Sequence, residues 1–168
     1  MKKFFLLALG LTLASVSYSQ KFGYCNSGAL LTQIPEVKAA DSDLQAFQAQ
    51  LTKRGQEMVK ALQDKAAELD RKEKQGTISP KDLEAQNAKL KEEQATIAEY
   101  EQEVYKKLAE KREELFKPIL DRVNKAMEDV AKENQFMFVF DQNTQVLLYA
   151  DESLDVTKLV KTKLGIAN

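Results

Sequence analysis

Residues that could perform chemistry are sparse in this chain of 168 residues. The sequence contains no histidine, which is the commonest general base and the commonest metal ligand of proteins. Its single cysteine, Cys25, lies in an apolar stretch. We expect Cys25 to be buried and inert, and the alternative is a disulfide between two copies of the chain. The sequence therefore predicts no metal site, no cofactor and no enzymatic activity.

Nucleotides and nucleic acids are also disfavoured as ligands. The sequence has no glycine-rich motif of the kind that cradles phosphates. Its 25 basic residues are balanced by 26 acidic ones, which gives no electrostatic reason to expect nucleic-acid binding. An enzyme would need a pocket of converging polar groups, which cannot be assembled from these residues. A binding or structural role is therefore favoured.

The first 19 residues are typical of a secretory signal peptide. Two lysines precede an apolar run over residues 4–14, and small residues lead to a cleavage point expected before Gln20. The apolar run is too short to span a bilayer. The sequence therefore predicts export to the periplasm and removal of residues 1–19, with a function that permits contact with a membrane but does not require it.

Two long stretches in the middle of the chain are expected to be helical. Residues 38–75 and 80–134 are rich in residue types that favour helices. Their only glycine is Gly55, and their only internal proline is Pro118. A helix of about 35 residues at ~1.5 Å per residue would be ~50 Å long, which exceeds the diameter of a globule of this size. The helices are therefore expected to protrude.

A short turn connects the two helical stretches. Gly76 suits the left-handed position after a helix, Ser79 suits an N-cap, and Pro80 suits the first helical position. Helices joined by so short a turn must run antiparallel. The sequence therefore predicts a helical hairpin arm over residues 38–117, with its tip at residues 76–80.

The two predicted helices carry apolar residues at coiled-coil spacing. These residues are Leu44, Phe47, Leu51, Met58, Leu62 and Leu69 on the first helix, and Leu83, Leu90, Ile97 and Val104 on the second. The companion positions on the second helix, Asn87, Gln94 and Glu101, are polar. The hairpin is therefore expected to be weakly closed, with apolar side chains left over on its inner face.

Several arm residues are candidates for contact with a binding partner. The candidates are Phe47, Leu51, Met58, Leu62, Ile97 and Tyr100. Each could instead pack across the hairpin, and this alternative suits Leu51, Leu62 and Ile97 best. Met58 suits an adaptable binding surface, because methionine is flexible and polarizable.

Residues 20–37 and 118–168 are expected to form a small β body. The strand candidates cover residues 21–26, 136–141 and 145–150, with a hairpin turn at 141–144. A short helix within 27–34 and a final helix ended by Gly165 would complete the body. Both faces of the strands are apolar, whereas one helix can cover only one face of a three-stranded sheet. The other face is expected to contact another subunit through Phe22, Tyr24, Phe136, Phe138, Val139 and Leu148.

The order and spacing of these segments resemble the Skp/OmpH family of periplasmic chaperones over the whole mature chain. The most specific segments are Phe138-Val139-Phe140-Asp141, Val146-Leu147-Leu148-Tyr149-Ala150 and Leu154-Asp155-Val156-Thr157. The opening strand at 21–26 and the segment at 115–126 support the resemblance. It implies an α+β fold with a small β-barrel-like trimerisation body and a long antiparallel helical hairpin in each subunit, assembled as a jellyfish-like homotrimer.

The resemblance also implies a function. Such chaperones hold unfolded outer-membrane β-barrel proteins soluble in the periplasm, without ATP, until these are inserted into the membrane. The candidate arm residues named above would then contact such an unfolded client. The predicted arms are near neutral here, whereas well-known members are strongly basic, so neither electrostatic capture nor a lipopolysaccharide site is carried over. The alternative function is a structural coiled-coil scaffold of the cell envelope, which would bind one stable partner.

Overall fold

The structure is a computed structural model that describes residues 20–144 and 146–166. These residues form long helices together with one pair of short strands. The predicted signal peptide, residues 1–19, lies outside the described residues. Among the helices in the described ranges, none is long and apolar enough to cross a membrane.

The chain folds as two compact units. Residues 34–121 make up the hairpin unit, and residues 20–33 together with 122–166 make up the strand unit. Helix α4 (Pro80–Glu133) contributes residues to both units. The predicted arm, residues 38–117, lies within the hairpin unit.

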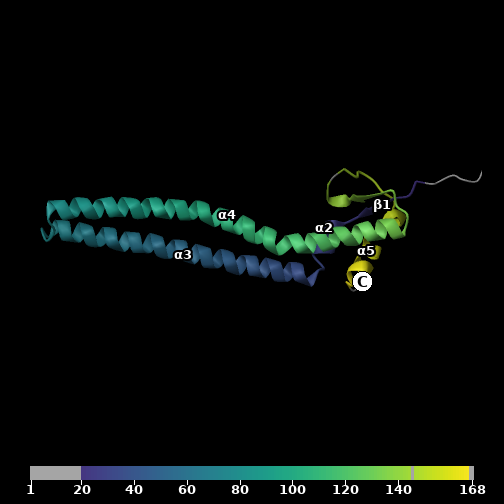
Figure 1. The fold of residues 1–168 in the computed structure, drawn as a ribbon, viewed down its shortest axis with the longest axis horizontal. Helices are drawn as coiled ribbons and strands as arrows, with labels where there is room; N and C mark the ends of the chain where they lie inside the picture. Colours follow the sequence, from purple (N-terminus) through teal and green to yellow (C-terminus); the bar gives the residue numbers. More distant parts are fainter. Residues whose placement is uncertain (1–19, 145, 167–168) are drawn as a thin grey trace, which may run out of the picture. The chain divides into compact units, whose positions relative to one another are not determined.

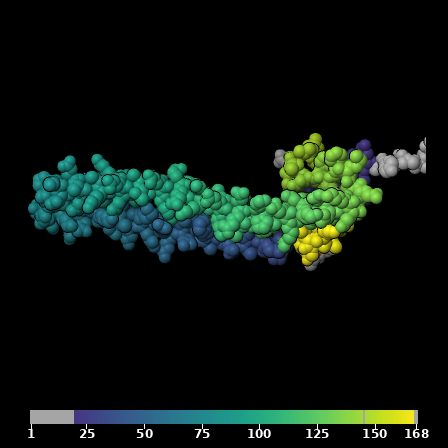
Figure 2. Space-filling model, viewed as in Figure 1, coloured from purple at the N-terminus to yellow at the C-terminus, as the bar shows by residue number. Residues whose placement is uncertain are grey.

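The hairpin unit consists of α3 (Pro35–Lys74) and the first part of α4, which run side by side from a short turn (Figure 1). The 40 residues of α3 make a helix ~60 Å long at ~1.5 Å per residue. It begins with Pro35. Proline is favourable at this position, because a backbone N–H in the first turn would have no hydrogen-bond partner within the helix. In Figure 2 the atoms of α3, in blue, and of α4, in teal, lie against one another on the visible face of the hairpin.

The turn between α3 and α4 is capped as predicted. Gly76 has a φ of 65°, in the left-handed region that favours glycine. The Ser79 hydroxyl oxygen accepts a hydrogen bond from the backbone N–H of Asp82 at 3.2 Å. Pro80 is the first residue of α4. The predicted antiparallel helical hairpin is therefore confirmed.

The strand unit contains a two-stranded parallel sheet of β1 (Phe22–Cys25) and β2 (Phe138–Asp141). On the other side of β1, the backbone N–H of Val156 donates a hydrogen bond to the carbonyl oxygen of Tyr24 at 2.9 Å. Two of the three predicted strands are therefore confirmed, although β2 begins two residues later than predicted.

The prediction of a third strand is wrong. Residues 146–150 form no strand, and η1 (Gln142–Thr144) is a 3₁₀ helix in place of the predicted hairpin turn. Gln145 itself lies outside the described residues. The apolar alternation suits a strand, but a strand exists only where another backbone pairs with it, and the Leu148 side chain is 96% exposed. The described sheet of one chain therefore has two strands.

Three further short helices complete the strand unit: α2 (Ser27–Leu31), η2 (Glu152–Leu154) and α5 (Thr157–Leu164). Gly165 ends α5 in the left-handed conformation, so both predicted short helices are confirmed. The buried apolar residues of this unit are Tyr24, Cys25, Leu30, Val123, Ala126, Val130, Val156 and Val160. The predicted burial of Cys25 is confirmed, because its side chain has no exposed surface.

Candidate functional site

The interface between α3 and α4 is only partly closed. The predicted apolar residues of α4 in this interface are all half-buried: Leu83, Leu90, Ile97 and Val104. Their polar companions Asn87, Gln94 and Glu101 are exposed. On α3, Leu51 and Leu69 are buried. The open interface expected from the polar companions is therefore present, and apolar surface of α4 remains accessible to solvent.

Tyr100 joins the two helices of the hairpin. Its hydroxyl donates a hydrogen bond to the backbone carbonyl oxygen of Leu51 at 3.0 Å, and both residues are only 7% exposed. The guanidinium carbon of Arg54 lies 5.5 Å from the centroid of the Tyr100 ring. A Cβ atom at Gly55 would lie 3.4 Å from the same ring. Tyr100 is therefore held inside the hairpin by contacts from α3.

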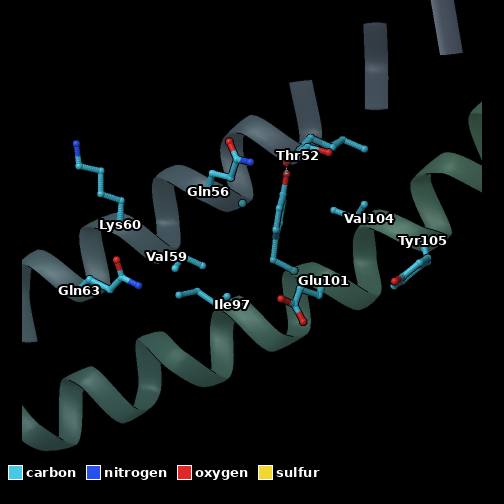
Figure 3. Close-up of a pocket in the computed structure, with 12 residues that line it drawn as sticks. Thr52, Gln56, Val59, Lys60, Gln63, Ile97, Glu101, Val104 and Tyr105 are labelled. Carbon is cyan, nitrogen blue, oxygen red and sulfur yellow. Dashed lines mark hydrogen bonds between the residues drawn. The ribbon is translucent and has the colours of Figure 1, made fainter. Parts of the chain in front are cut away.

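A groove of about 540 Å³ opens between the two helices beside this contact. Figure 3 shows Val59 of α3 and Ile97 of α4 pointing toward one another across it, while Lys60 extends away from α4. Other lining residues are Leu51, Thr52, Gly55, Gln56, Gln63, Tyr100, Glu101, Val104 and Tyr105. We call this the Gly55 groove. It is mainly apolar and lies wholly within the hairpin unit.

The Gly55 groove brings together three of the residues predicted to contact a bound polypeptide. Leu51 and Tyr100 form part of its buried base, and half-buried Ile97 forms part of its wall. The others are half-buried elsewhere on the hairpin: Phe47 and Met58 line two further grooves, and Leu62 lies on α3.

Other residues of the groove are not among the sequence candidates. Gly55, Val59 and Tyr105 line it, and the Tyr105 side chain is 73% exposed. Gly55 is the feature of the sequence that could have pointed to the groove, because a lone glycine inside a helical pattern often has a packing or functional reason. Val59 and Tyr105 lie outside the predicted apolar spacing, so their positions become evident only in the structure.

The strand unit carries a second apolar surface. The Phe138 side chain is 56% exposed and stacks on Phe22 and Phe140, with ring centroids 6.0 and 6.2 Å away. A mainly apolar cavity of about 260 Å³ is lined by residues that include Phe22, Tyr24, Phe140, Leu147, Tyr149 and Leu154. Monomeric soluble proteins rarely expose large contiguous apolar patches, so this surface is a candidate interface.

The residues predicted to mediate oligomerisation divide into exposed and covered ones. Phe22, Phe138 and Leu148 are exposed, whereas Phe136 and Val139 are half-buried and Tyr24 is buried. Exposed apolar residues that the sequence prediction omitted are Met137, Phe140, Val146, Tyr149 and Leu154.

Asp141, at the end of β2, connects this strand to the start of α2. One carboxylate oxygen accepts a hydrogen bond from the Ser27 hydroxyl at 2.6 Å, and the other accepts one from the Asn143 backbone N–H at 3.0 Å. Burial alone would raise the pKa of Asp141, but hydrogen bonds from Ser27 and Asn143 outweigh it and hold the pKa below the ordinary 3.8. The carboxylate is therefore part of the internal structure of the strand unit.

Apart from this network, the described residues offer few groups that could bind a metal ion or act as a nucleophile. Within residues 20–144 and 146–166 there is no cluster of three or more histidine, cysteine, aspartate or glutamate side chains that could hold a metal ion. Burial raises the pKa of the Cys25 thiol above its ordinary value, which keeps the thiol protonated at neutral pH.

The chain thus combines a long, partly open helical hairpin with a small strand unit that exposes apolar surface, and a family of proteins matches this chain. The sequence profile of the family described as "Outer membrane protein (OmpH-like)" matches residues 21–164. The chain therefore belongs to the OmpH-like family, as its sequence segments predicted.

Two known proteins are similar to the chain over most of its length. An uncharacterized protein of Aquifex aeolicus (strain VF5) is 29% identical over 164 residues, which cover 98% of this chain and 96% of the relative. The crystal structure of a candidate outer membrane chaperone (OmpH-like) from Caulobacter crescentus CB15 matches with a TM-score of 0.73 at 20% identity. That match covers 87% of this chain and 84% of the other, and supports the fold.

Proposed function

We propose that this protein is an ATP-independent holdase chaperone of the periplasm. It binds unfolded outer-membrane β-barrel proteins through its helical hairpin and prevents their aggregation before membrane insertion. Two findings support the chaperone class: the chain belongs to the OmpH-like family, and one solved neighbour is described as a candidate outer membrane chaperone (OmpH-like).

The observation that carries this proposal is the open interface of the hairpin. The apolar residues of α4 that face α3 are half-buried along the hairpin, and the Gly55 groove adds a larger apolar opening. Unfolded β-barrel proteins expose many apolar side chains in extended segments. Many weak apolar contacts along a long hairpin can hold such a chain without an energy source, because the contacts add through avidity.

The proposed assembly is a homotrimer joined through the strand unit. The exposed apolar side chains around Phe138 support association, because burying a large apolar side chain is favourable by roughly 1.5–3 kcal/mol. Residues 146–150 supply apolar side chains next to this surface. In the proposed trimer neighbouring subunits would cover this surface and form a barrel-like body, and three hairpins would surround one client.

The proposed localisation follows from the predicted signal peptide and from the family. In the periplasm a client would reach the hairpins before it inserts into the outer membrane. No nucleotide is needed for holding in this proposal, because release follows from the competing, more favourable insertion of the client.

A selectivity experiment tests the proposal against the scaffold alternative. The mature chain is mixed with an outer-membrane β-barrel protein, either freshly diluted from urea or already folded in detergent, and complexes are separated by size-exclusion chromatography. A holdase forms a complex with the unfolded form only. Absence of a complex with the unfolded form, together with capture of one folded envelope protein, would support the scaffold instead.

A further inference from the structure

We propose that the Gly55 groove is a subsite that takes an apolar side chain from an extended, uncharged segment of an unfolded polypeptide. This inference rests on the proposed holdase function and adds to it a place on the hairpin and a class of segment. It is carried by the glycine, by the fixed tyrosine beneath it and by the sparse charge of the lining.

The absence of a side chain at Gly55 keeps the groove open. Gly55 lies in the middle of α3, where glycine destabilises a helix relative to alanine. Packing does not demand glycine there, because a Cβ atom would meet the Tyr100 ring at 3.4 Å, which is an ordinary contact distance. A larger side chain at this position would occupy the groove. Glycine at this position therefore destabilises the helix, and the open apolar space of the groove is the structural feature that its missing side chain explains.

The base of the groove is held in place before any ligand arrives. The Tyr100 ring is fixed by the hydrogen bond from its hydroxyl to Leu51 and by the Arg54 guanidinium beside it. A preformed site loses less conformational entropy when it binds than a flexible one does. The groove is therefore suited to repeated, weak insertion of a client side chain.

The lining of the groove favours an uncharged segment. Its charged residues are Lys60 and Glu101, whose charges cancel, whereas the neighbouring groove beside Phe47 is lined by Lys107, Glu110, Lys111 and Glu114 among others. Nearer the turn, the Lys65 ammonium is paired with the Glu93 carboxylate at 2.6 Å. A balanced, mainly apolar groove offers no net charge to an anionic lipid or a nucleic acid.

Polar atoms in the groove suit the backbone of an extended peptide. Gln56 and Gln63 line the groove from α3, and each amide side chain can both donate and accept hydrogen bonds. The backbone of an extended segment presents unpaired N–H donors and C=O acceptors, which these amides could pair with. The volume of about 540 Å³ lies within the roughly 300–1,000 Å³ usual for sites that enclose a small ligand. Side chain and backbone of one segment can therefore be accommodated together.

The test uses fluorescence anisotropy of two labelled peptides with the full mature chain. In one peptide leucine alternates with serine, and in the other asparagine replaces every leucine. We expect the leucine peptide to bind more tightly, and Gly55→Leu to weaken its binding about tenfold because the new side chain fills the groove. Gly55→Ala should have an intermediate effect. Ala49→Leu, which adds the same side chain at an exposed position of α3, should leave the affinity unchanged.

A second variant guards against distortion of the helix by the larger residue. Val59→Ser removes apolar surface from the groove wall at a position that is 38% exposed, and it should also weaken binding of the leucine peptide. Equal affinities of wild type, Gly55→Leu and Val59→Ser would overturn the subsite. So would a change in sedimentation caused by Gly55→Leu, because it would indicate that a second copy of the chain covers the groove.

The subsite and the holdase proposal fail in different ways. A wild-type chain that keeps an unfolded β-barrel protein soluble but does not prefer the leucine peptide overturns the subsite and leaves the holdase proposal standing. A wild-type chain that prefers the leucine peptide, with the expected loss in Gly55→Leu, but does not keep the β-barrel protein soluble supports the groove as a peptide site and overturns the holdase function.

Discussion

The hydroxyl of Tyr100 on α4 donates a hydrogen bond to the backbone carbonyl oxygen of Leu51 on α3, over a distance of 3.0 Å. Tyr100→Phe removes this bond and keeps the ring. We expect the free energy of unfolding to fall by about 0.5–1.5 kcal/mol, measured by urea denaturation followed by circular dichroism. Tyr105→Phe is the control, because that side chain is 73% exposed and its loss should change stability little. Equal stabilities of the two variants would contradict a role of this bond in closing the hairpin.

Gly76 and Gly55 are expected to respond oppositely to alanine. Gly76 has a φ of 65°, so Gly76→Ala should destabilise the hairpin by about 1–2 kcal/mol through backbone strain alone. No atom lies within 4 Å of the added Cβ. Gly55 lies inside α3, so Gly55→Ala should stabilise the protein by about 0.5–1 kcal/mol. Thermal unfolding measures both changes. A shift of the same sign in both variants would refute the assignment of Gly76 to a left-handed turn position and Gly55 to a helical one.

Asp141 should make the stability of the strand unit depend on pH. Its pKa in the folded chain is lower than in the unfolded chain, so its contribution is present above the unfolded pKa of about 4 and is lost as the pH falls through the folded pKa. Asp141→Asn cannot titrate. The difference in unfolding free energy between wild type and variant should therefore shrink from pH 7 to acid pH. A difference that stays constant over this range would argue against a stabilising carboxylate.

Phe138→Asp should dissociate the proposed trimer. The side chain is 56% exposed in one chain, so a charge there is tolerated by the monomer but would be buried without a partner in the assembly. Analytical ultracentrifugation should report monomers for Phe138→Asp and the wild-type mass for Val59→Asp, an equivalent change on the hairpin. If Phe138→Asp sediments as the wild type does, the strand unit is not the site of assembly.

Local signals predicted the hairpin better than the sheet. Gly76, Ser79 and Pro80 act through bonds and dihedral angles of their immediate neighbours, so their effect can be predicted from the sequence alone. The third strand was predicted from apolar alternation over residues 145–150, but pairing depends on a distant backbone that alternation does not specify.

The same distinction separates the site residues. Apolar spacing identified Ile97 and Leu51 as residues that face the other helix. The hydrogen bond from Tyr100 to a main-chain carbonyl could not be predicted, because every residue offers such an acceptor and only the relative positions of the helices select one. Gly55 was visible in the sequence, but the groove beside it depends on which α4 residues lie opposite.

Light scattering of a diluted client measures the proposed holding activity. An outer-membrane β-barrel protein is diluted from urea into buffer with no nucleotide, either with the mature chain or with an equal mass of an unrelated soluble protein. A holdase keeps the scattering low when it is in excess over the client, and the scattering rises as the holdase becomes limiting. Equal scattering with this chain and with the unrelated protein would contradict the proposed function.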